Sequence, residues 1–223
     1  MTGVQTCALP IWRVICGPTG SGKTRLLHAL RDVGAQVLDL EGLAHHRSSV
    51  LGLIPGQSQP SQKKFDTLIW DALGRFDPQG PVFVESESRK VGNVSIPEAL
   101  MTAMRASACI RVETATELRV ELLMQDYPFF VQDSDFFCTR LQTLVDLRGR
   151  EVVQAWCEAA QSGRSREVVR QLLEQHYDPG YAQSTQRNYS RFADAQVLQL
   201  DDIGASALRR LAQGLLSGLP PSA

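Results

Sequence analysis

The sequence predicts an α/β fold in three layers, in which a parallel sheet of about five strands is covered by helices on both faces. Short apolar runs alternate with segments of helical periodicity in the first half of the chain, a pattern typical of βαβ units. One further apolar run follows a long stretch that contains only helical patterns. We therefore expect a helical insertion before the last strand of the sheet.

Short apolar runs are the candidates for strands, and capping signals mark the helices between them. Lys23 begins the first expected helix. Ser61 caps a second helix, and Ser95 with Glu98 has the spacing of a capping box for a third. The expected strands are 12–16, 36–40, 82–84, 108–112 and 197–200.

The helical insertion is expected over residues 114–195. It opens on a second capping-box pattern, Thr114 with Glu117. The Asp-Pro-Gly sequence at 178–180 is typical of a turn, so we expect the last helix of the insertion to end there. Apolar helix faces are expected at 137–145, 152–159 and 168–176, and a final helix at 203–216.

The domain is expected to span residues 12–217, followed by a short tail at 218–223. Residues 1–11 carry no Lys or Arg, and their apolar part is too short for a signal sequence. We expect them to be a leader that is either non-native sequence or disordered, with the true N-terminus missing.

Composition narrows the class of protein. The 223 residues are 43% hydrophobic and 21% charged, which excludes a disordered chain, and no apolar run approaches the ~20 residues of a membrane span. The formal net charge of −1 gives no basic footprint of a nucleic-acid partner, although it does not exclude RNA. The five cysteines lack CxxC spacing, which argues against zinc or a disulfide framework and favours a reducing compartment. We expect a cytoplasmic globular protein with no membrane partner.

One motif carries most of the functional information. Residues 17–24 match the pattern G-x-x-x-x-G-K-[ST] of a phosphate-binding loop, between an expected strand and an expected helix. Glycines allow positive φ, so successive N–H groups can surround an anion at the positive end of the helix dipole. The fold is therefore expected to be P-loop NTPase-like, with Lys23 as the catalytic cation that reaches the terminal phosphates. The phosphate-binding residues are Gly17, Pro18, Thr19, Gly20, Ser21, Gly22, Lys23 and Thr24.

Such a loop recognises phosphates rather than the group attached to them, so ATP, GTP or a prenyl diphosphate are all candidate ligands. The Thr24 hydroxyl is a candidate Mg²⁺ ligand. Glu85, at the end of the third expected strand, is a candidate for the acidic residue of the same metal shell. The alternative for Glu85 is a solvent-facing carboxylate at a strand end.

Polar clusters follow two strands at the carboxyl edge of the expected sheet, where open α/β sheets bind ligands. Glu41, His46 and Arg47 are candidates for contacts with substrate or tRNA, and a solvated loop is the alternative. Zinc binding by the two adjacent histidines is not favoured, because neighbouring side chains do not converge. The second cluster, which we interpret as an active-site loop rather than a surface turn, consists of Glu85, Ser86, Glu87 and Arg89.

Other features have ordinary structural interpretations. The composition of residues 56–62 favours a flexible linker. The arginines of the insertion, from Arg140 to Arg170, have carboxylates nearby, so we interpret them mainly as helix-surface ion pairs, with RNA phosphates as the alternative partners. Cys16 and Trp156 are expected to be core residues.

Four stretches resemble the C-terminal half of bacterial tRNA 2-selenouridine synthases: residues 38–47 (LDLEGLAHHR), 59–62 (QPSQ), 85–89 (ESESR) and 176–181 (HYDPGY). The resemblance covers about residues 12–216, and the phosphate loop falls where that family has it. His45 stands where the family usually has Asn, which is a mild departure.

The resemblance implies a tRNA-modifying transferase that acts on a wobble 2-thiouridine. In the family, the base is first S-geranylated from geranyl diphosphate, and the geranylthio group is then replaced by selenium from selenophosphate. The family's N-terminal half is a rhodanese-like domain whose cysteine serves the selenium step, and no cysteine of this chain matches it. We therefore expect this chain to be competent at most for geranyl transfer.

Two other classes of function remain open on the sequence. A small-molecule or nucleotide kinase would use the insertion as a lid that carries an arginine to the γ-phosphate. A noncatalytic RNA-binding module with a regulatory nucleotide site would show steep salt dependence of RNA binding without turnover.

Overall fold

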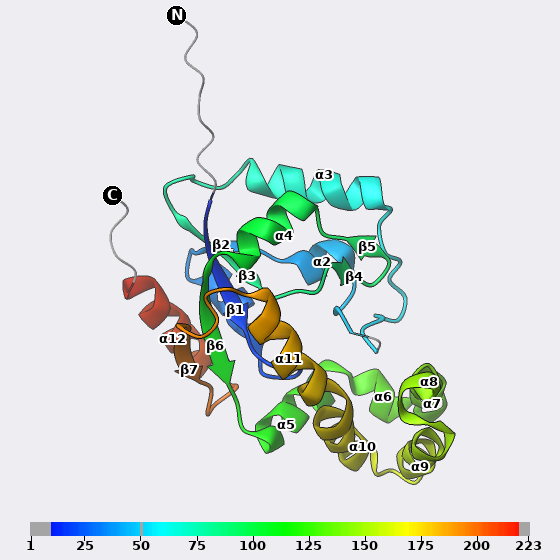
Figure 1. Cartoon of the computed structure of the whole chain (residues 1–223). Helices are drawn as coiled ribbons and strands as arrows, with labels where there is room; N and C mark the ends of the chain where they lie inside the picture. The colour runs from blue at the N-terminus through cyan, green and yellow to red at the C-terminus, as the bar shows by residue number, and fades with distance from the viewer. Residues whose placement is uncertain (1–9, 50, 219–223) are drawn as a thin grey trace, which may run out of the picture.

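The computed structural model describes residues 10–49 and 51–218 (Figure 1). At its centre is a parallel five-stranded sheet of order β2-β3-β1-β6-β7, which confirms the expected α/β fold class. The predicted leader up to residue 9 and the predicted tail beyond residue 218 lie outside the described residues. The strands are β1 (Ile11–Cys16), β2 (Gln36–Leu38), β3 (Pro81–Glu85), β6 (Ala108–Glu113) and β7 (Gln196–Gln199).

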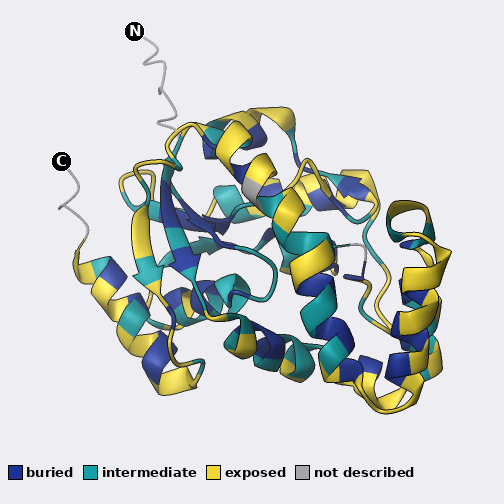
Figure 2. Cartoon of the chain, turned by 60° about the horizontal axis from the view of Figure 1, so that its bottom comes forward, coloured by how far each residue is buried: buried dark blue, intermediate teal, exposed yellow. Residues whose placement is uncertain are grey.

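Helices cover both faces of the sheet and form the two outer layers. Successive side chains of a strand point to opposite faces, so Ile15 and Phe83 join a core with α1 and α12. Val14 and Val84 join a second core with α3 and α4 on the other face. Figure 2 shows the buried strands between helices whose outer surfaces are exposed. These helices are α1 (Lys23–Asp32), α3 (Gln62–Leu73), α4 (Glu98–Arg105) and α12 (Ala205–Ser217).

The chain between β6 and β7 forms a helical lobe beside the carboxyl edge of the sheet (Figure 1). The lobe has its own core, which includes Phe137, Trp156 and Leu172. The expectation of a helical insertion before the last strand is therefore confirmed. Its elements are α5 (Thr116–Asp126), α6 (Pro128–Gln132), α7 (Ser134–Gln142), α8 (Val145–Arg148), α9 (Arg150–Gln161), α10 (Ser165–Leu172), the π-helical turn η1 (Leu173–Tyr177) and α11 (Asp178–Asn188).

The expectation that a helix ends at residues 178–180 is wrong. The helix continues from α10 through η1 into α11, which carries Asp178 and Pro179 in its first turn. Pro179 is the second residue after the π-helical turn, where the regular bonding to the fourth preceding residue is already interrupted, so its missing N–H costs little. The Asp178 carboxylate is occupied by Arg119, a partner distant in sequence.

Neither expected capping box forms. The N-caps of α4 and α5 are Pro97 and Ala115, and neither makes a side-chain cap. Thr114 uses its hydroxyl to donate to the carbonyl of Ser21, 2.9 Å away, so a tertiary contact replaces the local one. β2 is also shorter than expected, because Asp39 caps the short helix that follows it.

Residues 56–62 are not a flexible linker. The amide of Gln59 donates to the carbonyls of Ala44 and Val91 and accepts from the N–H of Asn93. Hydrogen bonds to three backbone groups anchor the segment against a short helix and a β-hairpin near the carboxyl edge of the sheet. These elements are α2 (Leu40–Ala44), β4 (Lys90–Val91) and β5 (Val94–Ser95).

The expectation of two core residues is confirmed, because Cys16 and Trp156 are buried. The expectation of surface ion pairs in the lobe is confirmed for three arginines, in the pairs Arg164–Glu167, Arg166–Glu121 and Arg170–Glu117. Arg148 instead donates to Nδ1 and to the carbonyl of His176. Among the described residues, no helix has the length and hydrophobicity needed to cross a bilayer.

Candidate functional site

The phosphate loop connects β1 to α1 at the carboxyl edge of the sheet. Gly20 and Gly22 have φ values of 74° and 86°, a region that favours glycine, so the expected backbone geometry is present. Gly22 is also tightly packed, because a Cβ there would lie 2.6 Å from Cδ2 of the buried Leu200. Lys23 Nζ donates to the carbonyls of Gly17 and Pro18, at 2.8 and 3.2 Å, and so lies over the loop itself.

A cavity of about 830 Å³ opens over this loop, between the sheet and the helical lobe. The loop contributes Lys23 and Thr24, and α11 contributes Tyr181 and Arg187 from the opposite side. Both halves of the molecule therefore build one site, as expected for ligands at the carboxyl edge of an open α/β sheet.

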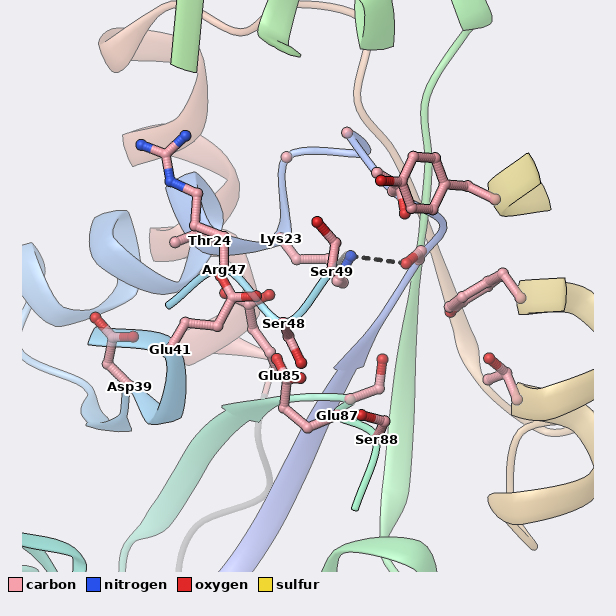
Figure 3. Close-up of a pocket in the computed structure, with 18 of the residues that line it drawn as sticks. Lys23, Thr24, Asp39, Glu41, Arg47, Ser48, Ser49, Glu85, Glu87 and Ser88 are labelled. Atoms are coloured by element: carbon pink, nitrogen blue, oxygen red, sulfur yellow. Dashed lines mark hydrogen bonds between the residues drawn. The ribbon is translucent and has the colours of Figure 1, made fainter. Parts of the chain in front are cut away.

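Carboxylates from two elements gather beside Lys23. Ile15 of β1 lies in register with Glu85 of β3, so Glu85 is held beside the start of the phosphate loop. Glu87 follows two residues later, and Glu41 comes from α2. Figure 3 shows Lys23, Glu41, Glu85 and Glu87 around the same space. The cavity thus places a cluster of carboxylates beside the cationic Lys23.

Burial raises the pKa of all three glutamates, because it disfavours the charged carboxylate. The pKa of Glu87 rises to about 8 through burial and the nearby charge of Glu85. The pKa of Glu41 is also raised, by burial and by the charges of Glu85 and Glu87. Burial raises the pKa of Glu85, although Lys23 and Thr24 oppose this shift. A cation in this region would relieve the mutual repulsion.

Unpaired polar atoms support a ligand in this cavity. Glu85 Oε1 and Arg105 Nε are buried, lack a hydrogen-bond partner and belong to residues that line the cavity. Buried polar atoms without partners are uncommon and call for an ion, a water or a ligand. Proteins usually bind Mg²⁺ through one or two of their own oxygens together with phosphate oxygens of the substrate. The side-chain oxygens of Glu85 and Thr24, at the phosphate loop, match this ligand set.

Most of the sequence-predicted site residues meet in this cavity. Pro18 and Ser21 do not line it: Pro18 accepts from Lys23 through its carbonyl, and the Ser21 side chain is buried against Gly17. His46 does not line it either, because it is buried beside a bridge to Leu53. Those that line the cavity are Gly17, Thr19, Gly20, Gly22, Lys23, Thr24, Glu41, Arg47, Glu85, Ser86, Glu87 and Arg89.

Arg47 connects the polar segment that follows β2 to the helical lobe. Its guanidinium lies 4.3 Å from the ring centre of Tyr127 and donates to the carbonyl of Asp126. His45, two residues before Arg47, is exposed and bonds to the carbonyl of Ser58. Within the described residues, no group of three or more metal-ligating His, Cys, Asp or Glu side chains is arranged to hold a metal ion by itself.

Sequence reasoning missed the residues that the lobe contributes. Arg119, buried in α5, donates to the carbonyl of Thr19 in the phosphate loop and to the carboxylate of Asp178. Tyr177 and Tyr181 line the cavity from η1 and α11. The HYDPGY sequence at 176–181 was the available signal. Because it is typical of a turn that ends a helix, it did not predict that Tyr177 and Tyr181 line the cavity.

A parallel α/β sheet with a glycine-rich phosphate loop between its central strand and first helix defines a protein of the P-loop class. The family described as the tRNA 2-selenouridine synthase AAA domain matches residues 11–142. The chain belongs to this family, which confirms the resemblance seen in the sequence.

Named relatives agree with this assignment. The tRNA 2-selenouridine synthase of Nitrosomonas europaea is 35% identical over 170 residues, which cover 74% of this chain and 40% of that protein. The enzyme of the same name from Aeromonas salmonicida is 34% identical over 198 residues, covering 76% and 52%. The chain thus spans about half the length, or less, of these relatives.

Solved structures show likeness of fold only. TT1252 from Thermus thermophilus matches with a TM-score of 0.42 and 20% identity, over 95% of this chain and 99% of that one. Shikimate kinase from Acinetobacter baumannii matches with a TM-score of 0.39 and 16% identity, over 95% and 93%.

Proposed function

We propose that the chain carries out the geranyl-transfer part of a tRNA 2-selenouridine synthase reaction, with tRNA and geranyl diphosphate as substrates. Family membership supports the tRNA substrate. The observation that carries the chemistry is the cavity in which the phosphate loop and Lys23 lie beside buried carboxylates. Selenium transfer from selenophosphate would belong to the complete enzyme, together with a rhodanese-like domain outside the residues of this chain.

In the proposed reaction, the sulfur of 2-thiouridine attacks the allylic carbon of geranyl diphosphate. The new C–S bond forms as the C–O bond breaks, and the electron pair of that bond leaves with diphosphate. The N3 proton of the base passes to solvent water, which leaves the modified base neutral. Negative charge therefore grows on the diphosphate in the transition state, where fixed N–H groups and a cation stabilise it most effectively.

Different residues of this chain would bind the diphosphate, hold Mg²⁺ and contact substrate phosphate or tRNA. The N–H groups of the loop and Lys23 Nζ bind the diphosphate, for which Lys23 leaves the loop carbonyls. Mg²⁺ held by Thr24 and Glu85 would supply further charge neutralisation. Arg47 and Arg89, at the cavity wall, would contact substrate phosphate or tRNA.

The direct test is geranyl transfer from geranyl diphosphate to 2-thiouridine-containing tRNA by the Lys23→Ala variant. We expect the fold to persist, because Lys23 is half-buried and, among the described residues, its side chain donates to carbonyls of its own loop. We expect the rate to fall to less than about one hundredth, the scale of losing one charged transition-state contact. Lys63→Ala, an exposed lysine on α3, is the matched control and should keep full activity.

Retention of more than a few per cent of the rate by Lys23→Ala would reject the proposed role. Parallel titrations with ATP and geranyl diphosphate separate this proposal from a kinase. Binding of ATP with phosphate transfer, and no binding of geranyl diphosphate, would contradict geranyl transfer and leave the phosphate loop in place.

A further inference from the structure

A second, apolar space opens beside the phosphate cavity, and we refer to it as the apolar crevice. It lies within the helical lobe, between α5, α6, α7 and α10. None of the side chains that line it is charged. Its walls include Leu51, Leu123, Phe130, Phe137, Val169 and Leu172.

The apolar crevice adjoins the phosphate cavity. Thr19, Ser49, Leu123, Tyr127 and Tyr177 line both spaces. Because Thr19 belongs to the phosphate loop, the loop that would hold a diphosphate also forms part of the crevice wall. The anion-binding and apolar surfaces therefore lie next to one another.

We infer that the apolar crevice binds the hydrocarbon chain of a diphosphate ester whose phosphates lie on the loop. This inference rests on the proposed function and deepens it by assigning the residues that select the chain. A ligand with an anionic head and an apolar tail matches the order of surfaces from Lys23 to Phe137.

The chemistry of the walls favours a hydrocarbon over a nucleobase. A base that entered the crevice would bury its polar edges among Leu, Val and Phe side chains, and unsatisfied buried polar groups are costly. A hydrocarbon loses no hydrogen bonds there and gains from leaving water. Four of the five hydroxyl-bearing residues that line the crevice also line the phosphate cavity: Thr19, Ser49, Tyr127 and Tyr177. The fifth, Ser165, lines the crevice alone.

The size of the crevice predicts selection by chain length. Its volume is about 40 Å³, so it holds only the end of a chain. The remainder would lie beside Leu123 and Met124, which are half-buried, and the flexible Met124 side chain can adjust to a branched chain. Phe130 and Phe137 are buried, with ring centres 4.5 Å apart, and line the crevice but not the phosphate cavity.

The test is calorimetric titration of the chain with inorganic pyrophosphate and with dimethylallyl, geranyl and farnesyl diphosphates. We expect affinity to rise from pyrophosphate to geranyl diphosphate by at least about tenfold, because several apolar carbons leave water. We expect no further rise for farnesyl diphosphate, whose longer chain meets Phe130 and Phe137. Equal affinity for all four compounds would overturn the inference.

Two variants change the crevice in opposite directions. Val169→Phe fills it and should lower affinity for geranyl diphosphate at least about tenfold, with pyrophosphate binding unchanged. Phe130→Ala lengthens it and should raise the affinity for farnesyl relative to geranyl diphosphate. Val152→Phe, on a partly exposed face of α9 outside the crevice, is the control and should change neither.

The results also separate this inference from the proposed function. If pyrophosphate binds through Lys23 but neither chain length nor the Val169→Phe and Phe130→Ala variants alter affinity, the crevice assignment is wrong and the phosphate site stands. If Val169→Phe weakens geranyl diphosphate and pyrophosphate equally, the crevice does not hold the chain. If no diphosphate binds the unaltered chain, both proposals fail.

Discussion

Arg119 and Asp178 form a two-point ion pair that links the start of the helical lobe to its last helix. Arg119 Nη1 and Nη2 donate to the two carboxylate oxygens at 2.9 and 2.6 Å. The same guanidinium donates from Nε and Nη2 to the carbonyl of Thr19, at 3.0 and 2.7 Å. One buried side chain therefore fixes the phosphate loop to two helices of the lobe, and the shape of the loop depends on the lobe being folded.

Replacing Arg119 should destabilise the protein and weaken phosphate binding together. Arg119→Ala leaves Asp178 and the Thr19 carbonyl without their partner, and we expect a loss of about 3 kcal/mol in the free energy of unfolding. Urea unfolding and pyrophosphate titration measure the two effects. Arg166→Ala removes an exposed arginine of the same lobe, paired with Glu121, and should cost less than about 1 kcal/mol. Equal losses in the two variants would contradict the linking role.

Gly22 is required by its backbone and by its packing. A left-handed conformation costs an ordinary residue ~1–2 kcal/mol. Gly34 has a φ of 94°, and a Cβ added there would meet no atom within 4 Å. Gly34→Ala should therefore show the backbone cost alone. Gly22→Ala adds the contact with buried Leu200, so we expect a further ~1–3 kcal/mol. Denaturant unfolding of the two variants gives the difference directly. No difference would mean that the loop has room for a Cβ.

Glu85 should be required for the effect of Mg²⁺ on diphosphate binding. In the Glu85→Gln variant, we expect the gain in pyrophosphate affinity caused by Mg²⁺ to disappear, because an amide oxygen carries no net charge to attract the ion. Titrations with and without Mg²⁺ test this. Glu98→Gln, an exposed carboxylate on α4, should retain the gain. A Mg²⁺ effect that survives in Glu85→Gln would place the metal elsewhere.

His28 and Asp39 should give a small pH-dependent contribution to stability. His28 Nε2 lies 2.9 Å from Asp39 Oδ2, and this hydrogen bond raises the pKa of His28 despite partial burial. The charge of Arg31 opposes the rise and that of Glu85 adds to it. Burial raises the pKa of Asp39, but the bonds from His28 and the N–H of Gly42 outweigh this and leave it lowered.

Because the folded-state pKa of His28 is raised, its stabilisation is complete below about pH 6.5 and is lost as the pH rises through the raised value. His28→Gln should therefore lower the free energy of unfolding more at about pH 6 than at about pH 9. The difference should stay below about 1 kcal/mol, since the His28 side chain is 42% exposed. In an Asp39→Asn background the larger loss at the lower pH should be greatly reduced, because Asp39 is the main cause of the raised pKa of His28. A larger effect of His28→Gln at the higher pH would contradict this account.

The sheet and the phosphate loop could be predicted because their signals are local. The nearly continuous burial of β1 and β3 is what strands covered on both faces require, so short apolar runs predict them. The loop needs only glycines and Lys23 in fixed order. The position of Glu85 and Glu87 could also be predicted. Both follow a parallel strand, and ligands of open α/β sheets bind at the edge where the carboxyl ends of these strands lie.

The rest depends on contacts between segments distant in sequence. Thr114 has a capping-box partner in sequence, yet its hydroxyl bonds to Ser21, 93 residues away. Asp178 occurs in a turn-like sequence, yet Arg119, 59 residues away, holds it inside a helix. Tyr127 and Tyr181 reach the cavity only because the lobe packs against the sheet edge, and no local pattern encodes that packing.

The π-helical turn between α10 and α11 sets the rotational phase of everything after it. A helix advances by about 100° per residue, so one residue more or less in Leu173–Tyr177 turns α11 by that angle about its axis. Tyr181 and Arg187 would then face away from the cavity, while the composition and length of the lobe stayed almost the same. Single-residue gaps at this point in related sequences would therefore mark proteins whose cavity wall, and hence substrate, differs.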